Sequence, residues 1–413
     1  KKNTYIMGPL VETIALHGRL DKSWDAEPAV VRLTKNADVP DPHRHALLAS
    51  QETPASDNGF NAILCARHST PEVVNGAVRL PPELAYLDEG DVVRLNPRRG
   101  ELSVIYRRTS KTNSLLLTER CNSWCVMCSQ PPKNRDDSYL AEALLEAIPL
   151  ISPEAEEIGF TGGEPTILGG QFLALVEACK VYLPNTSLHV LSNGRSFNYL
   201  TFAQDFSSVA PTDTMLGVPL YSDLAWHHDY VVQSPGAFDQ TIRGILNLAR
   251  CQVAVEIRVV LQSSTVSRLP QLARFIARNL PFVQQVALMG YEPIGFGKAN
   301  SEVLWIDPLD CHAELSKAVE ILDAARIPVL LFNHQLCTIP VDLWKYSCQS
   351  ISDWKNIYLS KCQGCEVQDL CGGFFHSATE THSRGIQPVE IDVKSRAVVE
   401  SLRSRMSEDI QFN

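Results

Sequence analysis

The sequence predicts an α/β protein built on a TIM-like partial (β/α)6 barrel, with a small β-rich module before it and a cysteine-rich extension after it. Three observations support this prediction. Residues 111–332 alternate apolar strand patterns with amphipathic helix patterns, which is typical of a parallel sheet with right-handed crossovers. Residues 1–110 contain short alternating stretches separated by Pro and Gly turns, and residues 333–413 contain a second group of cysteines.

Composition limits the classes of function. The 413 residues are 45% hydrophobic, which is enough for a large core and suggests two or three domains. The formal charge of −10 argues against a nucleic acid as the main partner, because phosphate binding needs a basic face. No run of eighteen apolar residues and no apolar signal segment is present, so we expect a cytoplasmic protein without a membrane partner. The clustering of the twelve cysteines suits metal ligation in a reducing compartment.

In the first 110 residues, strand-like stretches lie at 62–67, 73–80, 91–95 and 102–106. Turn signals stand at Asn75-Gly76, Glu89-Gly90 and Arg99-Gly100. Two interpretations stay open for this module. It could bind a peptide by adding a strand at a sheet edge, or it could be a structural lid or a dimerisation module.

The barrel prediction uses six apolar strand patterns, at residues 114–118, 157–161, 187–191, 214–220, 253–261 and 283–289. Helices are expected at about 139–150, with Ser138 as N-cap, and at 171–182, 238–250 and 269–279. Loops that follow parallel strands meet at the carboxyl edge of the sheet. The sequence therefore predicts one functional rim.

The loop after the first strand holds Cys121, Cys125 and Cys128. A cubane [4Fe–4S] cluster normally has four cysteine ligands, so three cysteines leave one iron open. The amino and carboxylate groups of S-adenosylmethionine (SAM) can chelate an open iron. A zinc knuckle is the alternative, but zinc prefers paired Cys-x2-Cys or Cys/His clips.

The second strand runs into a turn made of Gly162, Gly163, Glu164 and Pro165. Glycines let a backbone approach a small ligand, and a carboxylate can accept hydrogen bonds from an ammonium group. We expect this turn to orient the methionyl amine of SAM. Ser192-Asn193, after the third strand, could bond the ribose or the methionyl group, and an ordinary type I′ turn is the alternative.

The extension holds Cys362, Cys365 and Cys371 as Cys-x2-Cys-x5-Cys, with Cys337 and Cys348 before them. Three cysteines and one earlier cysteine make a four-ligand set for a second [4Fe–4S] cluster or for zinc. Spacing alone does not separate the two metals.

Cys121-x3-Cys125-x2-Cys128 and the Gly162–Pro165 turn resemble the motifs of the radical SAM superfamily. The resemblance implies that the cluster reduces SAM to methionine and a 5′-deoxyadenosyl radical, with an external electron donor. Met127 departs from the usual aromatic residue, but it can fill the same packing role. The glycine-rich stretch Met289–Asn300 lies where relatives pack adenine, and a flexible connection is the alternative.

The C-terminal cysteines resemble the SPASM or twitch auxiliary-cluster extension of peptide maturases. Phe375 replaces a cysteine of the longer version, which implies one auxiliary cluster, with Cys337 preferred as fourth ligand because Ile-Pro follows it closely, as in relatives.

Residues 115–132, 350–358 and 371–375 are similar to the His-Xaa-Ser-system radical SAM maturases, the HxsC family. That resemblance implies a ribosomally made precursor peptide with His-Xaa-Ser repeats as substrate, which the enzyme oxidises or cross-links. It also implies a second radical maturase and a small accessory protein as partners. A small-molecule or RNA substrate, or a non-catalytic role in presenting the peptide, stays open. The sequence identifies no catalytic acid or base.

Overall fold

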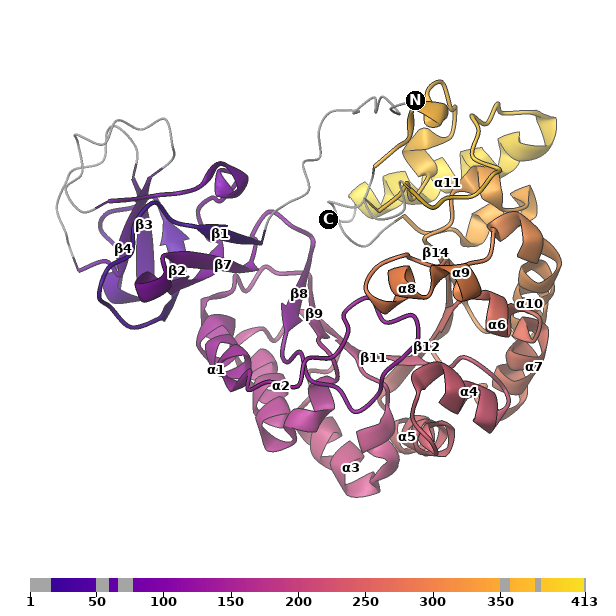
Figure 1. Cartoon of the computed structure of the whole chain (residues 1–413), viewed down its shortest axis with the longest axis horizontal. Coiled ribbons are helices and arrows are strands. Elements are labelled where there is room, and N and C mark those ends of the chain that lie inside the picture. The colour runs from indigo at the N-terminus through magenta and orange to yellow at the C-terminus, as the bar shows by residue number, and fades with distance from the viewer. Residues whose placement is uncertain (1–15, 50–58, 66–76, 350–356, 376–379, 412–413) are drawn as a thin grey trace.

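The computed structural model describes residues 16–49, 59–65, 77–349, 357–375 and 380–411. It contains two seven-stranded sheets and a helical C-terminal part (Figure 1). The N-terminal sheet lies at one end of the molecule, and the C-terminal residues lie across the larger sheet from it.

The N-terminal sheet confirms the predicted β-rich module. Its strands are β1 (His17–Arg19), β2 (Ala29–Thr34), β3 (His45–Ala49), β4 (Ala62–Cys65), β5 (Val78–Arg79), β6 (Val92–Asn96) and β7 (Glu101–Tyr106), in the order β1-β7-β6-β2-β3-β4-β5. Strands β6 and β7 form an antiparallel pair around the predicted turn at Arg99-Gly100, where Gly100 has a φ of 60°. Strands β2 to β5 pair in parallel instead, which the turn signals did not predict. The expected turn at Asn75-Gly76 lies outside the described residues.

The larger sheet is fully parallel and confirms the partial barrel. Its strands are β8 (Thr112–Leu116), β9 (Glu157–Thr161), β10 (Ser187–Leu191), β11 (Thr214–Pro219), β12 (Ala254–Val260), β13 (Gln285–Met289) and β14 (Val329–Phe332), in sequence order across the sheet. The first six correspond to the six predicted strands. Strand β14 extends the sheet by one strand beyond the prediction.

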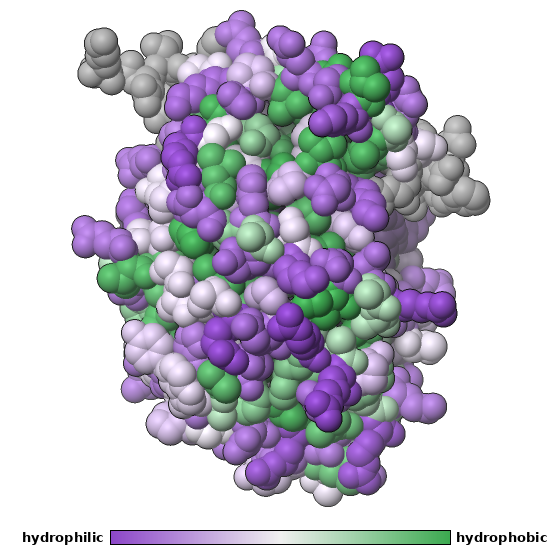
Figure 2. All heavy atoms as spheres, turned by 90° about the vertical axis from the view of Figure 1, so that its right-hand side faces the viewer, coloured by the Kyte–Doolittle hydropathy of each residue, from purple (hydrophilic) through white to green (hydrophobic). Residues whose placement is uncertain are grey.

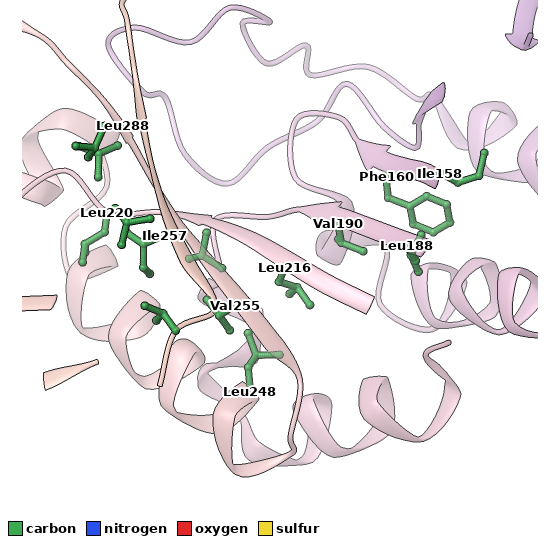
Figure 3. Packing of buried hydrophobic residues seen from close by; sticks show 14 of the residues in the cluster. Ile158, Phe160, Leu188, Val190, Leu216, Leu220, Leu248, Val255, Ile257 and Leu288 are labelled. Carbon is green, nitrogen blue, oxygen red and sulfur yellow. The ribbon is translucent and has the colours of Figure 1, made fainter. Parts of the chain in front are cut away.

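Helices cover the outer face of this sheet (Figure 1). They are α1 (Ser138–Ala147), α2 (Gly170–Tyr182), α3 (Leu200–Val209), α4 (Ala225–Val232), α5 (Ala237–Arg250), α6 (Ser263–Val266), α7 (Leu269–Asn279), α8 (Phe296–Ala299), α9 (Ser301–Leu304) and α10 (His312–Ala324), some of them short rim helices. Figure 3 shows the apolar side chains of the strands that pack toward the helices, such as Phe160, Val190 and Ile257. Each alternates with a neighbour on the opposite face of the sheet.

The prediction that Ser138 is the N-cap of α1 is wrong. Ser138 is the first residue of the helix and Asp137 takes the N-cap position. The Asp137 carboxylate makes no capping bond because it accepts hydrogen bonds from the cysteine loop.

The C-terminal part consists mainly of single 3-10 turns and one long helix, α11 (Val393–Gln411). The turns span Leu336–Thr338, Val341–Tyr346, Ser360–Cys362 and Gln368–Leu370. Hydrophilic residues are spread over the face of the molecule that carries this part (Figure 2). Within the described ranges, no helix is both long and apolar enough to cross a membrane.

Candidate functional site

The three cysteines predicted to hold a cluster lie together in the loop that follows β8. Burial, with smaller contributions from the neighbouring loop thiolates, raises the pKa of the Cys121 thiol to about 11 and that of Cys125 to about 12. Backbone N–H groups of Asn122 and Ser123 point toward the sulfur of Cys121. Half-buried thiols on one loop with N–H groups nearby suit a metal ligand set, because a bound metal compensates the mutual repulsion of thiolates.

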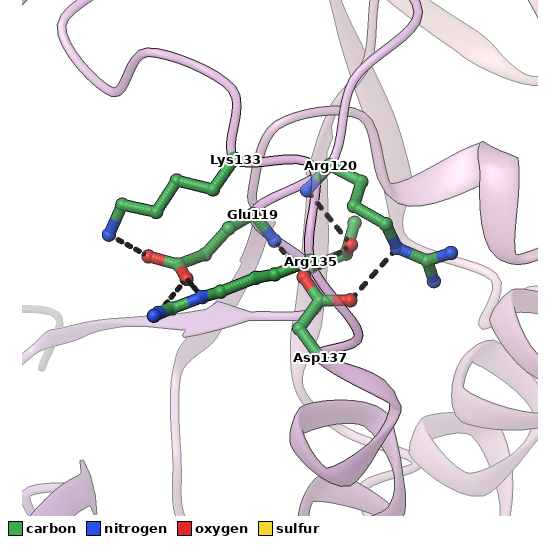
Figure 4. A network of polar contacts seen from close by, with 6 residues as sticks. Glu119, Arg120, Lys133, Arg135 and Asp137 are labelled. Carbon is green, nitrogen blue, oxygen red and sulfur yellow. Dashed lines mark hydrogen bonds and ion pairs between the residues drawn. The ribbon is translucent and has the colours of Figure 1, made fainter.

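The start of the loop is anchored by one buried carboxylate (Figure 4). Asp137 accepts hydrogen bonds from the Thr118 hydroxyl at 2.8 Å, from the backbone N–H of Glu119 and from Nε of Arg120 at 2.9 Å. Asp137 is 1% exposed. Since three consecutive residues bond to one fixed group, the chain enters the cysteine segment in a defined direction.

A second contact closes the far end of the loop. Glu119 forms ion pairs with Lys133 and Arg135, which lie beyond the cysteines (Figure 4). The N–H of Lys133 also donates to the carbonyl of Glu119 at 2.9 Å. The cysteines therefore lie within a segment whose two ends are joined.

Gly162 and Gly163 bring the turn after β9 onto this loop. Gly163 N–H donates to the Thr118 carbonyl at 2.8 Å, and Glu164 N–H donates to the Arg120 carbonyl at 2.9 Å. A Cβ on Gly162 would lie 2.5 Å from the Thr118 oxygen, and a Cβ on Gly163 would lie 2.2 Å from the Arg120 oxygen. The glycines thus allow one backbone to approach another, and their contact with SAM stays a prediction.

Glu164 joins this turn to the loop after β10. Its carboxylate accepts hydrogen bonds from the Ser192 hydroxyl at 2.8 Å, from the Asn193 N–H at 2.6 Å and from the Thr166 hydroxyl at 2.6 Å. Burial raises the pKa of Glu164, and these hydrogen bonds oppose the rise. The structure therefore brings Glu164, Ser192 and Asn193 together, with Pro165 starting the next 3-10 turn.

Arg195 is a site residue that the sequence analysis missed. Its guanidinium donates to the Asn122 carbonyl at 2.6 Å and to the Ser123 hydroxyl at 3.0 Å. Asn193 reaches Asn122 as well, through a 2.6 Å bond between their side-chain amides. The sequence signal for this residue was its position directly after Ser-Asn-Gly, because a long arginine side chain there can reach the neighbouring loop.

The glycine-rich segment after β13 lies on the other side of the cysteine loop. Phe296 N–H donates to the Cys128 carbonyl at 2.9 Å, and the Asn300 amide donates to the Val126 carbonyl at 2.7 Å. Gly295 has a φ of +57°, and a Cβ there would lie 2.6 Å from the Cys128 oxygen. This segment is therefore packed against the loop, and its contact with adenine stays a prediction.

His228 and Asp229 follow the fourth strand of the barrel and have structural contacts. Asp229 accepts hydrogen bonds from the N–H groups of Gly236 and Phe238 and so caps α5. His228 stacks on Tyr221, and burial lowers its pKa to about 4.

The C-terminal cysteines form a second group. Cys337, Cys362, Cys365 and Cys371 line one cavity, and Cys348 is not among its lining residues. Burial, with smaller contributions from the other three thiolates, raises the pKa of Cys337 to about 11. The fold thus brings together four cysteines that are up to 34 positions apart in sequence.

One backbone hydrogen bond reaches a sulfur of this cavity, from the N–H of Val389 to Cys365 at 3.4 Å. Backbone groups of Gln387, Leu359 and Gly373 oppose the rise in the pKa of Cys337, Cys362 and Cys371, respectively. Gln387 and Val389 both belong to the segment 386–391, for which the sequence predicted no role. Such N–H···S bonds stabilise thiolates and tune the potentials of iron–sulfur clusters.

Neither cysteine group has the geometry of a single-ion site. In the described part of the chain, no three His, Cys, Asp or Glu side chains are gathered closely enough to hold one metal ion. The ligands of a cubane stand farther apart than those of one zinc ion, because four irons lie between them. Four cysteines are a donor set that both a [4Fe–4S] cluster and zinc can use, so the second cluster stays a prediction.

Comparison with solved structures gives distant similarities. SuiB of Streptococcus suis is 12% identical, with a TM-score of 0.44; the match covers 57% of this chain and 52% of SuiB, so this chain spans about half the length of SuiB. Native anSMEcpe with bound AdoMet is 14% identical, with a TM-score of 0.47, over 72% of this chain and 98% of that one. A radical SAM methyltransferase from Sphaerobacter thermophilus is 14% identical, with a TM-score of 0.41, over 59% and 72%.

No curated protein matches the chain. Among protein families, residues 115–276 match the family model of the Radical SAM superfamily. This range begins in β8 and includes the cysteine loop, the Gly162–Pro165 turn and Ser192-Asn193. A match to the Radical SAM superfamily model implies a [4Fe–4S] cluster and SAM as cofactors. Residues 115–276 of this chain therefore form a radical SAM superfamily domain.

Proposed function

We propose that this chain is a radical SAM maturase that oxidises or cross-links a ribosomally made precursor peptide with His-Xaa-Ser repeats. The observation that carries the proposal is the contact between the three-cysteine loop and the turn containing Glu164. These are the two segments that a cluster and its bound SAM would share. The similarity of residues 115–132 and 371–375 to the His-Xaa-Ser-system maturases supports the peptide substrate.

Cys121, Cys125 and Cys128 would hold the first cluster, and Cys337, Cys362, Cys365 and Cys371 would hold an auxiliary one. When bound, the first cluster and SAM supply a 5′-deoxyadenosyl radical, and the second cluster supplies an acceptor for an electron from the substrate. The chain's own residues position these parts. Asp137, Arg195 and Glu164 fix the loops, and Glu164, Ser192 and Asn193 would orient the methionyl part of SAM.

The proposed partners are the precursor peptide, a second radical maturase, a small accessory protein and an external electron donor. Co-expression of the chain with a precursor peptide of His-Xaa-Ser repeats, followed by mass spectrometry, tests the proposal. We expect a mass loss of two hydrogens per oxidation or cross-link in the peptide. The same loss should disappear when Cys121, Cys125 and Cys128 are all replaced by Ala. An unchanged peptide mass, with 5′-deoxyadenosine still formed, would contradict the peptide substrate.

A further inference from the structure

The inner face of the barrel sheet carries a polar cluster that the proposed chemistry does not use. Leu188 and Val190 pack toward the helices (Figure 3), so His189 between them points to the inner face. Glu256 and Arg258 point to the same face from β12 by the same alternation.

Arg258 is only partly satisfied by its neighbours. Its Nη1 pairs with Oε1 of Glu256 at 2.6 Å, and Gln285 donates to Oε2 of Glu256 at 2.5 Å. The other terminal nitrogen, Nη2, faces the Met289 sulfur at 3.3 Å, and a thioether is a weak acceptor. One edge of the guanidinium is thus fixed, while another edge has no oxygen acceptor among the described residues.

The second polar group, His189, is unsatisfied at one of its two ring nitrogens. Its Nε2 is buried and makes no hydrogen bond within the described residues. The nearest carboxylate oxygen, Oε1 of Glu256, is 3.7 Å away. Burial lowers the pKa of His189, so the ring is neutral at pH 7. An unpaired buried nitrogen is unfavourable, so a ligand group that pairs with Nε2 would be stabilised at this position.

Gly217 makes room for these two groups. It lies on β11, between the strands that carry His189 and Arg258. A Cβ on Gly217 would lie 2.8 Å from Cδ of Arg258 and 3.1 Å from Nε2 of His189. Any larger residue would therefore displace one of the two side chains.

The charges on this face indicate the kind of group that binds. Arg258 is balanced by Glu256, and His189 is neutral. Glu157 lies near enough to Glu256 for the two carboxylates to repel each other, so it adds negative charge to this face. The negative charge of Glu157 would repel a carboxylate ligand. An amide offers a carbonyl acceptor and an N–H donor without net charge.

We propose that Arg258 and His189 bind one amide group of the substrate on the inner face of the barrel. Arg258 donates to the amide oxygen, and His189 Nε2 accepts from the amide N–H. The assignment of the amide to a peptide rests on the proposed function. Arg258 lies two residues before the end of β12, roughly 7 Å below the rim, whereas Glu164 and Ser192 lie in loops beyond the strand ends. The pair is therefore placed for substrate and not for SAM.

The test uses three variants of the cluster-loaded protein. Arg258→Gln removes the guanidinium group and its charge, and Arg258→Lys keeps the charge without the planar set of N–H donors. The double variant Glu256→Gln, Arg258→Gln removes both charges of the buried ion pair. The double variant keeps the experiment informative if a lone Glu256 charge prevents folding. Arg274→Gln, on the exposed side of α7, is the matched control.

Two measurements are made on each variant. The first is the dissociation constant for a synthetic peptide of His-Gly-Ser repeats and, separately, for SAM. We expect the peptide to bind about 10–100-fold more weakly to each Arg258 variant, because a charge-assisted hydrogen bond contributes 1.5–3 kcal/mol, and SAM binding to stay unchanged. The second is the shift of the His189 ring nitrogen signals on addition of N-methylacetamide or acetate, assigned with His189→Gln.

N-methylacetamide should shift the His189 signals in the wild-type protein and not in Arg258→Gln. A shift with acetate alone, or with neither probe, would overturn the amide site. Equal weakening of SAM and peptide would overturn it too, since the pair would then hold the cofactor. If N-methylacetamide shifts the signals but wild-type protein binds no peptide, the amide site stands and the proposed peptide substrate fails.

Discussion

The backbone of Gly163 lies so close to Arg120 that a Cβ on Gly163 would stand 2.2 Å from the Arg120 carbonyl oxygen. This contact joins the turn after β9 to the cysteine loop. It also explains in steric terms why glycine is required at this position, before any ligand is considered.

Gly163→Ala should separate the two loops. The clash is with backbone atoms that cannot rotate away, so we expect iron content after anaerobic reconstitution to fall by about half, the share of one of two cubane clusters. Gly170→Ala is the control, because a Cβ there meets nothing within 4 Å. Normal iron in Gly163→Ala, with normal 5′-deoxyadenosine formation, would show that the contact is not needed.

Asp137→Asn should loosen the start of the cysteine loop. The amide NH2 cannot accept from Thr118 or Glu119, so at least one buried donor loses its acceptor, at a cost of about 1–3 kcal/mol. Urea unfolding should report this loss, and iron should leave the variant faster under a chelator. The neighbouring Asp136→Asn changes an exposed carboxylate and should match the wild type. Equal unfolding free energies and equal rates of iron loss in the two variants would show that Asp137 does not hold the cysteine loop.

The two candidates for the fourth auxiliary ligand can be separated directly. Cys337 lines the cavity with Cys362, Cys365 and Cys371, whereas Cys348 does not. We therefore expect Cys337→Ala to lose about four irons per chain and Cys348→Ala to lose none. Zinc in place of iron at this cavity, measured by elemental analysis of protein purified anaerobically, would contradict the auxiliary cluster.

His334 makes stability depend on pH. It is 3% exposed, both ring nitrogens are unpaired among the described residues, and burial lowers its pKa from 6.5 to about 4. Between pH 4 and 6.5 the unfolded chain binds more protons than the folded one, so the contribution is complete above pH 6.5 and is lost as the pH falls toward 4. The full change is about 3 kcal/mol.

His334→Phe should therefore flatten the dependence of unfolding free energy on pH in this window, measured by urea titration as the difference from wild type. His43→Phe, at an exposed position, is the control. Parallel curves for wild type and His334→Phe would mean that His334 is not buried in its neutral form.

The sequence predicted six of the seven barrel strands because each is an apolar run between turn residues. It missed β14, whose four residues are too short for a periodic pattern and whose place is set by pairing with β13. It also identified Glu164 and Ser192, but it could not show that they bond to each other across two strands. The donors Gln387 and Val389 were missed for a similar reason, since only the folded chain brings backbone N–H groups from residues 386–391 to Cys337 and Cys365.

The central claim is that Cys121, Cys125 and Cys128 hold a cluster that cleaves SAM. The most direct test measures 5′-deoxyadenosine after anaerobic reconstitution, with SAM and dithionite, in the wild type and in the variant with all three cysteines replaced by Ala. We expect the wild type to form 5′-deoxyadenosine, and the triple variant to form none while it keeps about four irons at the C-terminal cysteines. Formation of 5′-deoxyadenosine by the triple variant would contradict the account.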